Sequence, residues 1–271
     1  ASNAGQSSCT SCVAGLYSAD AAIQCSDCPE GTYSAAEATT CTDCSVGYYV
    51  SETGASACVA CAAGTYAGSE GGTICTDCPA GYFASSTGAS SCAACDSGYY
   101  SGTGEASCTK CSAGKFQNAT GATSCRECPR GRAQADTGED ACDPCDPGTY
   151  MADTGETTCL RCSSEKGKGY WSSEGATECD QAAEGYFFNT EQGEPEVCQE
   201  GVDCSEAGTT TESMELAGGL YKFAATSADV YTCPSPLNCK GGRSNATVRV
   251  GQELCIEGAY GPLCALWCVN S

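Results

Sequence analysis

Large apolar side chains are scarce in this sequence, and aromatic rings return at near-regular intervals through the first 162 residues. Each ring follows a glycine by two positions, as in Gly31/Tyr33 and Gly81/Phe83, and polar segments rich in Ser and Thr fill the intervals. The sequence shows no apolar stripe of helical period. Short extended segments joined by turns are therefore predicted, and long helices are not.

Cysteines mark the same period. Ten Cys-x-x-Cys pairs follow one another at steps of 16 or 17 residues. A fixed period of this length indicates one small unit copied many times and stacked end to end. We therefore predict a small disulfide-rich fold, an elongated, rod-like array of about ten to eleven short irregular β-hairpin repeats with a C-terminal disulfide-rich β module. The pairs begin at Cys9, Cys25, Cys41, Cys58, Cys75, Cys92, Cys108, Cys125, Cys142 and Cys159.

Two glycines punctuate most repeats. The first lies three residues after the second Cys of a pair, and the second lies four residues before the next pair, usually after Thr, as in Thr87-Gly88. Glycine permits positive φ in tight turns. The aromatic between them supplies apolar cover over a disulfide or a neighbouring repeat. Each repeat is thus expected to be a two-stranded hairpin, although the first two repeats lack the second glycine and Ala133 replaces one ring.

The rhythm changes after Cys162, which gives three predicted regions. Residues 1–162 are tandem repeats, and 163–187 are a degenerate terminal repeat with Ala182 where the pair-mate of Cys179 belongs. Residues 188–271 form a C-terminal cysteine-rich module. Two short strands are expected there, around Leu220, Tyr221, Phe223, Val230 and Tyr231.

The cysteine content points to an oxidising compartment. The chain has 28 cysteines in 271 residues, an even number, as a fully paired framework requires. Its formal charge is −22 and it has no His. Nucleic acid and anionic membrane surfaces are excluded as partners, because both need Lys and Arg. No apolar segment approaches the length of a membrane span. A secreted or extracellular-surface location is predicted.

The simplest disulfide scheme joins the second Cys of each pair to the first Cys of the next. Closing each Cys-x-x-Cys on itself is the alternative, and such tight rings are strained and typically redox-active. The favoured scheme leaves Cys9 for an upstream cysteine or for a neighbouring copy, and the spacing of Cys255 and Cys264, which matches the last loop of an epidermal-growth-factor-like module, predicts a bond in the tail. The scheme gives Cys12–Cys25, Cys28–Cys41, Cys44–Cys58, Cys61–Cys75, Cys78–Cys92, Cys95–Cys108, Cys111–Cys125, Cys128–Cys142, Cys145–Cys159 and Cys162–Cys179.

Other chemistry finds little support in the sequence. Four-thiolate zinc sites are the natural alternative for paired Cys-x-x-Cys motifs, but the acidic composition and the ten similar copies favour disulfides. The absence of His removes the usual general base. We expect no enzyme activity, no cofactor and no metal. Asn118-Ala119-Thr120 and Asn245-Ala246-Thr247 are acceptor motifs for N-glycosylation at Asn118 and Asn245.

The repeat Cys-x-x-Cys-x-x-Gly-x-Tyr…Thr-Gly-x-x-x-Cys resembles the ephrin-receptor-like cysteine-rich repeats, which are close to the first submodule of tumour-necrosis-factor receptors. Long arrays of this repeat occur in surface proteins of unicellular eukaryotes (protists), and residues 230–264 resemble the segment that follows such arrays. The resemblance implies fold and location more strongly than function, because the module serves many roles.

Two functions are consistent with these features. The first is an extracellular structural protein, a rod-like subunit of a filament, coat or flagellar-hair-like assembly. The alternative is the ectodomain of a cell-surface receptor or adhesin, with the repeats as stalk and exposed aromatics in residues 216–232 as the contact surface. The expected partners are further copies of the chain or other extracellular proteins, with glycans attached.

Overall fold

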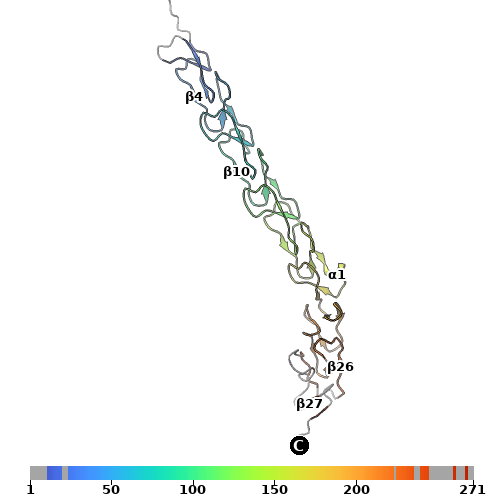
Figure 1. The fold of residues 1–271 in the computed structure, drawn as a ribbon. Coiled ribbons are helices and arrows are strands. Elements are labelled where there is room, and N and C mark those ends of the chain that lie inside the picture. The colour runs from blue at the N-terminus through green and yellow to red at the C-terminus, as the bar shows by residue number, and fades with distance from the viewer. Residues whose placement is uncertain are drawn as a thin grey trace, which may run out of the picture. The chain divides into compact units, whose positions relative to one another are not determined.

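A computed structural model describes residues 11–19, 24–222, 224–234 and 239–243, together with strands Ala259–Tyr260 and Leu266–Trp267. The strands of these described residues pair into fourteen two-stranded antiparallel sheets, each joining two strands that are consecutive in the chain. The described residues contain one short helix, α1 (Cys162–Glu165). The predicted array of short hairpins is confirmed, and Figure 1 shows these hairpins along the chain.

We number the hairpins 1 to 14 in chain order, so that β1 and β2 form hairpin 1 and β27 and β28 form hairpin 14. Most strands are only two residues long. Their bounds are β1 (Leu16–Tyr17), β2 (Ser26–Asp27), β3 (Thr32–Tyr33), β4 (Thr42–Asp43), β5 (Tyr48–Tyr49), β6 (Val59–Ala60), β7 (Thr65–Tyr66), β8 (Thr76–Asp77), β9 (Tyr82–Phe83), β10 (Ala93–Ala94), β11 (Tyr99–Tyr100), β12 (Thr109–Lys110), β13 (Lys115–Phe116), β14 (Arg126–Glu127), β15 (Arg132–Ala133), β16 (Asp143–Pro144), β17 (Thr149–Tyr150), β18 (Leu160–Arg161), β19 (Tyr170–Trp171), β20 (Gln181–Ala182), β21 (Tyr186–Asn189), β22 (Glu194–Val197), β23 (Val202–Asp203), β24 (Glu215–Leu216), β25 (Leu220–Tyr221), β26 (Tyr231–Thr232), β27 (Ala259–Tyr260) and β28 (Leu266–Trp267).

Contacts divide the chain into two compact units. The first unit comprises Ala1–Glu127 and Asp136–Ala141, and the second comprises Cys128–Ala135 and Cys142–Ser271. Hairpins 1 to 7 thus belong to the first unit. The domain boundaries expected from the sequence, after residues 162 and 187, stay predictions.

The interior of each repeat is occupied by a disulfide. Cys28 and Cys44 are 0 % exposed, and the amide of Cys44 donates to the carbonyl oxygen of Gly31 at 2.8 Å, which closes hairpin 2. The aromatic at the end of the first strand pairs across the hairpin with the residue after the first Cys, as Tyr33 does with Thr42. Because the buried side chains in these repeats are mostly small, the disulfides replace an apolar core.

The residue after each aromatic joins three consecutive hairpins through its backbone. In hairpin 3, Val50 donates its amide to the carbonyl of Gly72 at 3.0 Å and accepts from the amide of Gly31 at 2.9 Å. Gly31 and Gly72 belong to the repeats before and after. In hairpins 2 to 10 the residues at this position are all buried, and we call them the linking residues. They are Ser34, Val50, Ala67, Ala84, Ser101, Gln117, Gln134, Met151 and Ser172.

The two glycines of the repeat meet across a distance of two hairpins. Gly47 in hairpin 3 has φ +85°, and a Cβ built there would overlap the carbonyl oxygen of Gly88 in hairpin 5. Glycine is therefore required both by backbone conformation and by close approach. The corresponding pairs are Gly15/Gly54, Gly31/Gly71, Gly64/Gly104, Gly81/Gly121 and Gly98/Gly138 in the first unit and Gly131/Gly175 in the second.

The second unit adds an apolar cluster that the described repeats of the first unit lack. Phe187, Met214 and Tyr221 are at most 3 % exposed and pack together with Leu216 and with cysteines that include Cys204. Three hairpins contribute to the cluster: 11, 12 and 13. Larger side chains therefore take over part of the role that disulfides have in the array.

Two expectations for the tail can be compared with the strand register. Leu220 pairs with Thr232 and Tyr221 with Tyr231, so two short strands form as predicted, but Val230 precedes the second strand and Phe223 lies outside the described residues. The position of the missing pair-mate of Cys179 was wrong by one residue. Ala182 ends strand β20, and it is the next amide, of Ala183, that donates to Gly169 at 2.8 Å as the second Cys of a repeat does. One extra residue after Cys179 shifts the register.

Candidate functional site

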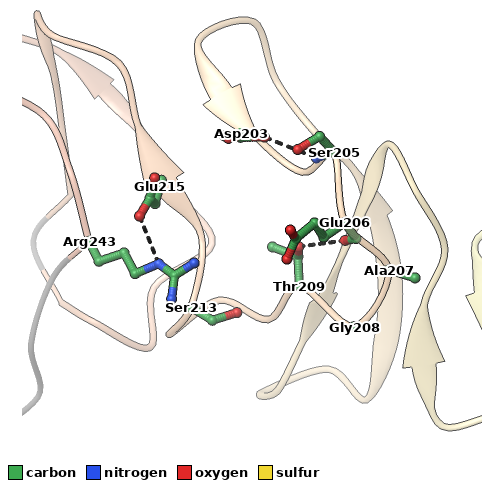
Figure 2. Close-up of a pocket in the computed structure, with 9 residues that line it drawn as sticks. All are labelled: Asp203, Ser205, Glu206, Ala207, Gly208, Thr209, Ser213, Glu215 and Arg243. Carbon is green, nitrogen blue, oxygen red and sulfur yellow. Dashed lines mark hydrogen bonds and ion pairs between the residues drawn. The ribbon is translucent and has the colours of Figure 1, made fainter. Parts of the chain in front are cut away.

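A polar recess lies in the second unit, beside hairpin 12. Its volume is about 360 Å³, and it opens to solvent. The loop from Asp203 to Thr209 forms one side, while Glu215 on β24 and Arg243 form the other (Figure 2). The recess therefore has three carboxylates, of Asp203, Glu206 and Glu215, and one guanidinium.

A hydrogen bond and an ion pair hold two of the charged side chains of the recess, those of Asp203 and Glu215. The backbone amide of Ser205 donates to Asp203 Oδ1 at 3.0 Å, and this bond lowers the pKa of the Asp203 carboxyl below its usual value. Arg243 Nε lies 2.9 Å from Glu215 Oε1, and both side chains are at least half exposed. Such an exposed ion pair contributes about 0–1 kcal/mol. Asp203 therefore stays ionised near neutral pH, and Glu215, another carboxylate of the recess, is already paired with Arg243.

This arrangement suits binding better than catalysis. Ser205 and Ser213 line the recess, but the sequence has no His to activate a hydroxyl as nucleophile. Across the described residues, no group of three or more Asp, Glu, Cys or His side chains is arranged to hold a metal ion. A small polar molecule with both donor and acceptor groups would match the mixed charges of the recess.

A buried lysine lies next to the apolar cluster. Lys222 is 1 % exposed; its ammonium donates to the backbone carbonyl of Thr211 and, at 2.7 Å, to that of Ala225. Removal from water lowers the pKa of Lys222 from 10.5 to about 8, an effect that the nearby carboxylate of Glu212 opposes. Lys222 thus holds two loops of the second unit together, and its proton is released at a lower pH than that of an ordinary lysine.

The aromatic contact surface expected in residues 216–232 is not formed as a whole. Tyr221 is 2 % exposed because it belongs to the apolar cluster, whereas Tyr231 is 40 % exposed. The sequence could not separate the two, since both occupy short strands of the same hairpin and pair with each other. Phe223 lies outside the described residues. Among the described residues of this segment, Tyr231 is the one exposed aromatic.

The cysteines of the array meet in the same pairs as in the favoured scheme. The structure has all ten bonds, from Cys12–Cys25 to Cys162–Cys179, with Cα atoms 5.6 to 5.8 Å apart. The second unit has two further disulfides, Cys198–Cys204 and Cys233–Cys239. The sequence did not indicate partners for these four cysteines. Cys9, Cys255 and Cys264 lie outside the described residues.

One of the two glycosylation motifs can be placed. Asn118, Ala119 and Thr120 are exposed on the loop of hairpin 7. The preceding linking residue, Gln117, anchors this loop, since its side chain accepts from the amide of Ala119 at 3.0 Å and donates to the carbonyl of Ser124 at 2.8 Å. Gln117 thus holds the start of the loop in place, and the side chain of Asn118 is left exposed to solvent. Asn245 lies outside the described residues.

Comparison with known proteins identifies the repeat. The sequence pattern of the family described as "Tyrosine-protein kinase ephrin type A/B receptor-like" matches residues 31–74 and 98–139. A search of curated proteins finds no match to the chain. The matched repeats are a disulfide-rich, non-catalytic type of module. Within the described residues, no helix has the length and apolarity that crossing a bilayer requires.

Proposed function

Because this is an extracellular cysteine-rich protein with ephrin-receptor-like repeats, we propose that it is a structural subunit of an extracellular filament, coat or flagellar-hair-like assembly. Self-association with further copies, N-linked glycans on Asn118 and Asn245, and an origin in a unicellular eukaryote are parts of the same proposal. A bond from Cys9 to a neighbouring copy would link subunits covalently.

One observation carries this proposal. Consecutive hairpins are joined by the same backbone hydrogen bonds again and again, as Gly31 to Val50 at 2.9 Å is repeated by Gly64 to Ala84 at 2.8 Å. The linking contacts use backbone atoms and glycines rather than particular side chains. Such contacts tolerate sequence change and extend in one dimension, which suits a structural element.

Electron microscopy of the native, oxidised material tests the proposal. We expect filaments or sheets with a regular repeat. Separate particles at every concentration, with or without the glycans, would contradict it.

The ectodomain of a receptor or adhesin is the second candidate, and the polar recess beside hairpin 12 favours it. Its paired Glu215 and Arg243 and its ionised Asp203 offer a binding site in the second unit. A full-length coding sequence with a membrane span after residue 271 would support this candidate over the first.

A further inference from the structure

Backbone hydrogen bonds hold one side of the polar recess beside hairpin 12. The loop that carries Glu206 is tied to the preceding hairpins at two points. The amide of Gly208 donates to the carbonyl of Ala182 at 2.8 Å, and the carbonyl of Thr209 accepts from the amide of Phe188 at 2.7 Å. The Glu206 side chain therefore extends from a loop whose course is fixed.

The opposite side of the recess is held in a similar way. Gly242 and Leu216 on β24 exchange two backbone hydrogen bonds, with N–O distances of 2.7 and 3.1 Å. Arg243 is the next residue, and its Nε lies 2.9 Å from Glu215 Oε1. Both sides are thus in place before a ligand arrives, which reduces the ordering cost of binding.

Opposite charges remain unpaired across this recess. The ion pair with Glu215 uses Nε of Arg243, so the Nη groups of the guanidinium keep donors without a partner among the described residues. The carboxylate of Glu206 likewise has no partner there. Figure 2 shows the two groups on opposite sides of the recess, too far apart to pair with each other.

The charge of Arg243 nevertheless acts across the recess. Hydrogen bonds from Ser205 are the main cause of the lowered pKa of the Asp203 carboxyl, and the positive charge of Arg243 adds to them. One side of the recess therefore offers the carboxylates of Asp203 and Glu206, and the other side offers the free donors of a guanidinium.

A ligand with a positive group at one end and a negative group at the other would satisfy both sides. We propose that the recess binds a short peptide with free termini. Its ammonium lies against the carboxylates of Glu206 and Asp203, and its terminal carboxylate accepts from the Nη groups of Arg243. The volume of about 360 Å³ is near the lower end of the roughly 300–1,000 Å³ of small-molecule sites, which suits a ligand of this size.

This binding goes beyond the proposed filament and gives the receptor or adhesin candidate a ligand class. Peptide binding by chains that form no filaments would support the inference and contradict the structural role. Filaments built from chains that bind no peptide would do the reverse. The two ideas can therefore fail separately.

An NMR titration of the full, oxidised chain with diglycine tests the inference. The amide signals of Ser205 and Gly208, which line the recess, should shift and reach saturation. Two analogues each remove one charge of the ligand: N-acetyldiglycine lacks the ammonium, and diglycinamide lacks the carboxylate. Each should bind about tenfold or more weakly, since each loses one charge-assisted contact.

Variants of the two facing side chains assign each end of the ligand. Glu206→Gln should weaken diglycine binding about tenfold and leave N-acetyldiglycine unaffected, because that analogue has no ammonium. Arg243→Gln should weaken diglycine and should not weaken diglycinamide. Both side chains are exposed, so the hairpin fold is retained. The matched control is Glu194→Gln, an exposed carboxylate on β22 that does not line the recess.

Three results would overturn the proposal. The first is a titration in which the recess signals show no saturable shift. The second is equal affinity for diglycine and its two analogues. The third is a loss of affinity in Glu194→Gln as large as that in Glu206→Gln.

Discussion

At the scale of residues, glycine has a larger role in this protein than a turn requires. Gly47 and its counterparts combine positive φ with a carbonyl oxygen in the space of a Cβ. The sequence predicts the turns from Gly and Thr-Gly, but it cannot predict that the two glycines meet, since they lie about 40 residues apart, in hairpins 3 and 5. The second repeat fits this explanation. Glu37 occupies the position of the second glycine with φ 64°, and no first glycine from two hairpins earlier packs on it among the described residues.

Gly47→Ala is expected to loosen hairpins 3 and 5. A left-handed conformation costs a residue with a Cβ roughly 1–2 kcal/mol, and the overlap with Gly88 adds to this cost. Hydrogen exchange of residues 44–92 should rise. Gly185→Ala is the matched control, because Gly185 has φ +83° but nothing within 4 Å of the added Cβ. Equal effects at the two positions would show that close approach is unimportant.

Lys222 gives the second unit a dependence on pH. Its pKa is about 8 in the folded chain against 10.5 for an ordinary lysine, so between these values the unfolded chain holds more protons. Stability therefore increases with pH in that window and is reduced below it. Denaturant unfolding between about pH 7 and pH 9, below the ionisation of tyrosine near 10, should show the increase. Lys222→Met removes the titrating group, and an unchanged slope in that variant would refute this role.

Asn118 is expected to carry a glycan in the native protein. Its side chain is exposed on a loop that Gln117 anchors from within the array. Peptide mass spectrometry before and after treatment with an N-glycosidase should show the characteristic conversion of Asn118 to Asp. Asn118→Gln should abolish the modification without altering the hairpin, and native material that is unmodified at Asn118 would contradict the prediction.

At the scale of elements, most of the array could be predicted from the sequence. Spacing alone gives one hairpin per period, because Gly-x-aromatic and Cys-x-x-Cys recur in fixed register, as Tyr49 against Val59 illustrates. The linking residues such as Ser34 and Val50 were missed. They share no residue type, since their role is carried by backbone amides and carbonyls, and only their burial marks them. The buried Tyr221 was likewise missed, because burial there depends on the packing of three hairpins.

Each hairpin is expected to be a local unit of stability. Replacing Cys78 and Cys92 by Ala opens the loop of hairpin 5, which costs about 3 kcal/mol for a loop of this size. Its hydrogen bonds and glycine contacts reach hairpins 3 to 7. Hydrogen exchange should therefore increase in those hairpins and not in hairpin 1. An increase throughout the first unit would mean that the array unfolds as a whole.

At the scale of the whole molecule, the two units are stabilised in different ways. The first unit relies on sulfur and backbone contacts repeated without large side chains, and the second adds Phe187, Met214 and Tyr221 in one cluster. The sequence shows this change only as the loss of the cysteine rhythm after Cys162.

The account rests on the pairing of the cysteines, and a disulfide map of the unreduced protein tests it most directly. Pepsin is the suitable protease, since the chain has no Lys or Arg before Lys110. Mass spectrometry should recover peptides joined from Cys28 to Cys41, from Cys44 to Cys58, and so on through Cys162 to Cys179. Bonds closed within Cys-x-x-Cys pairs, or free thiols along the array, would contradict it.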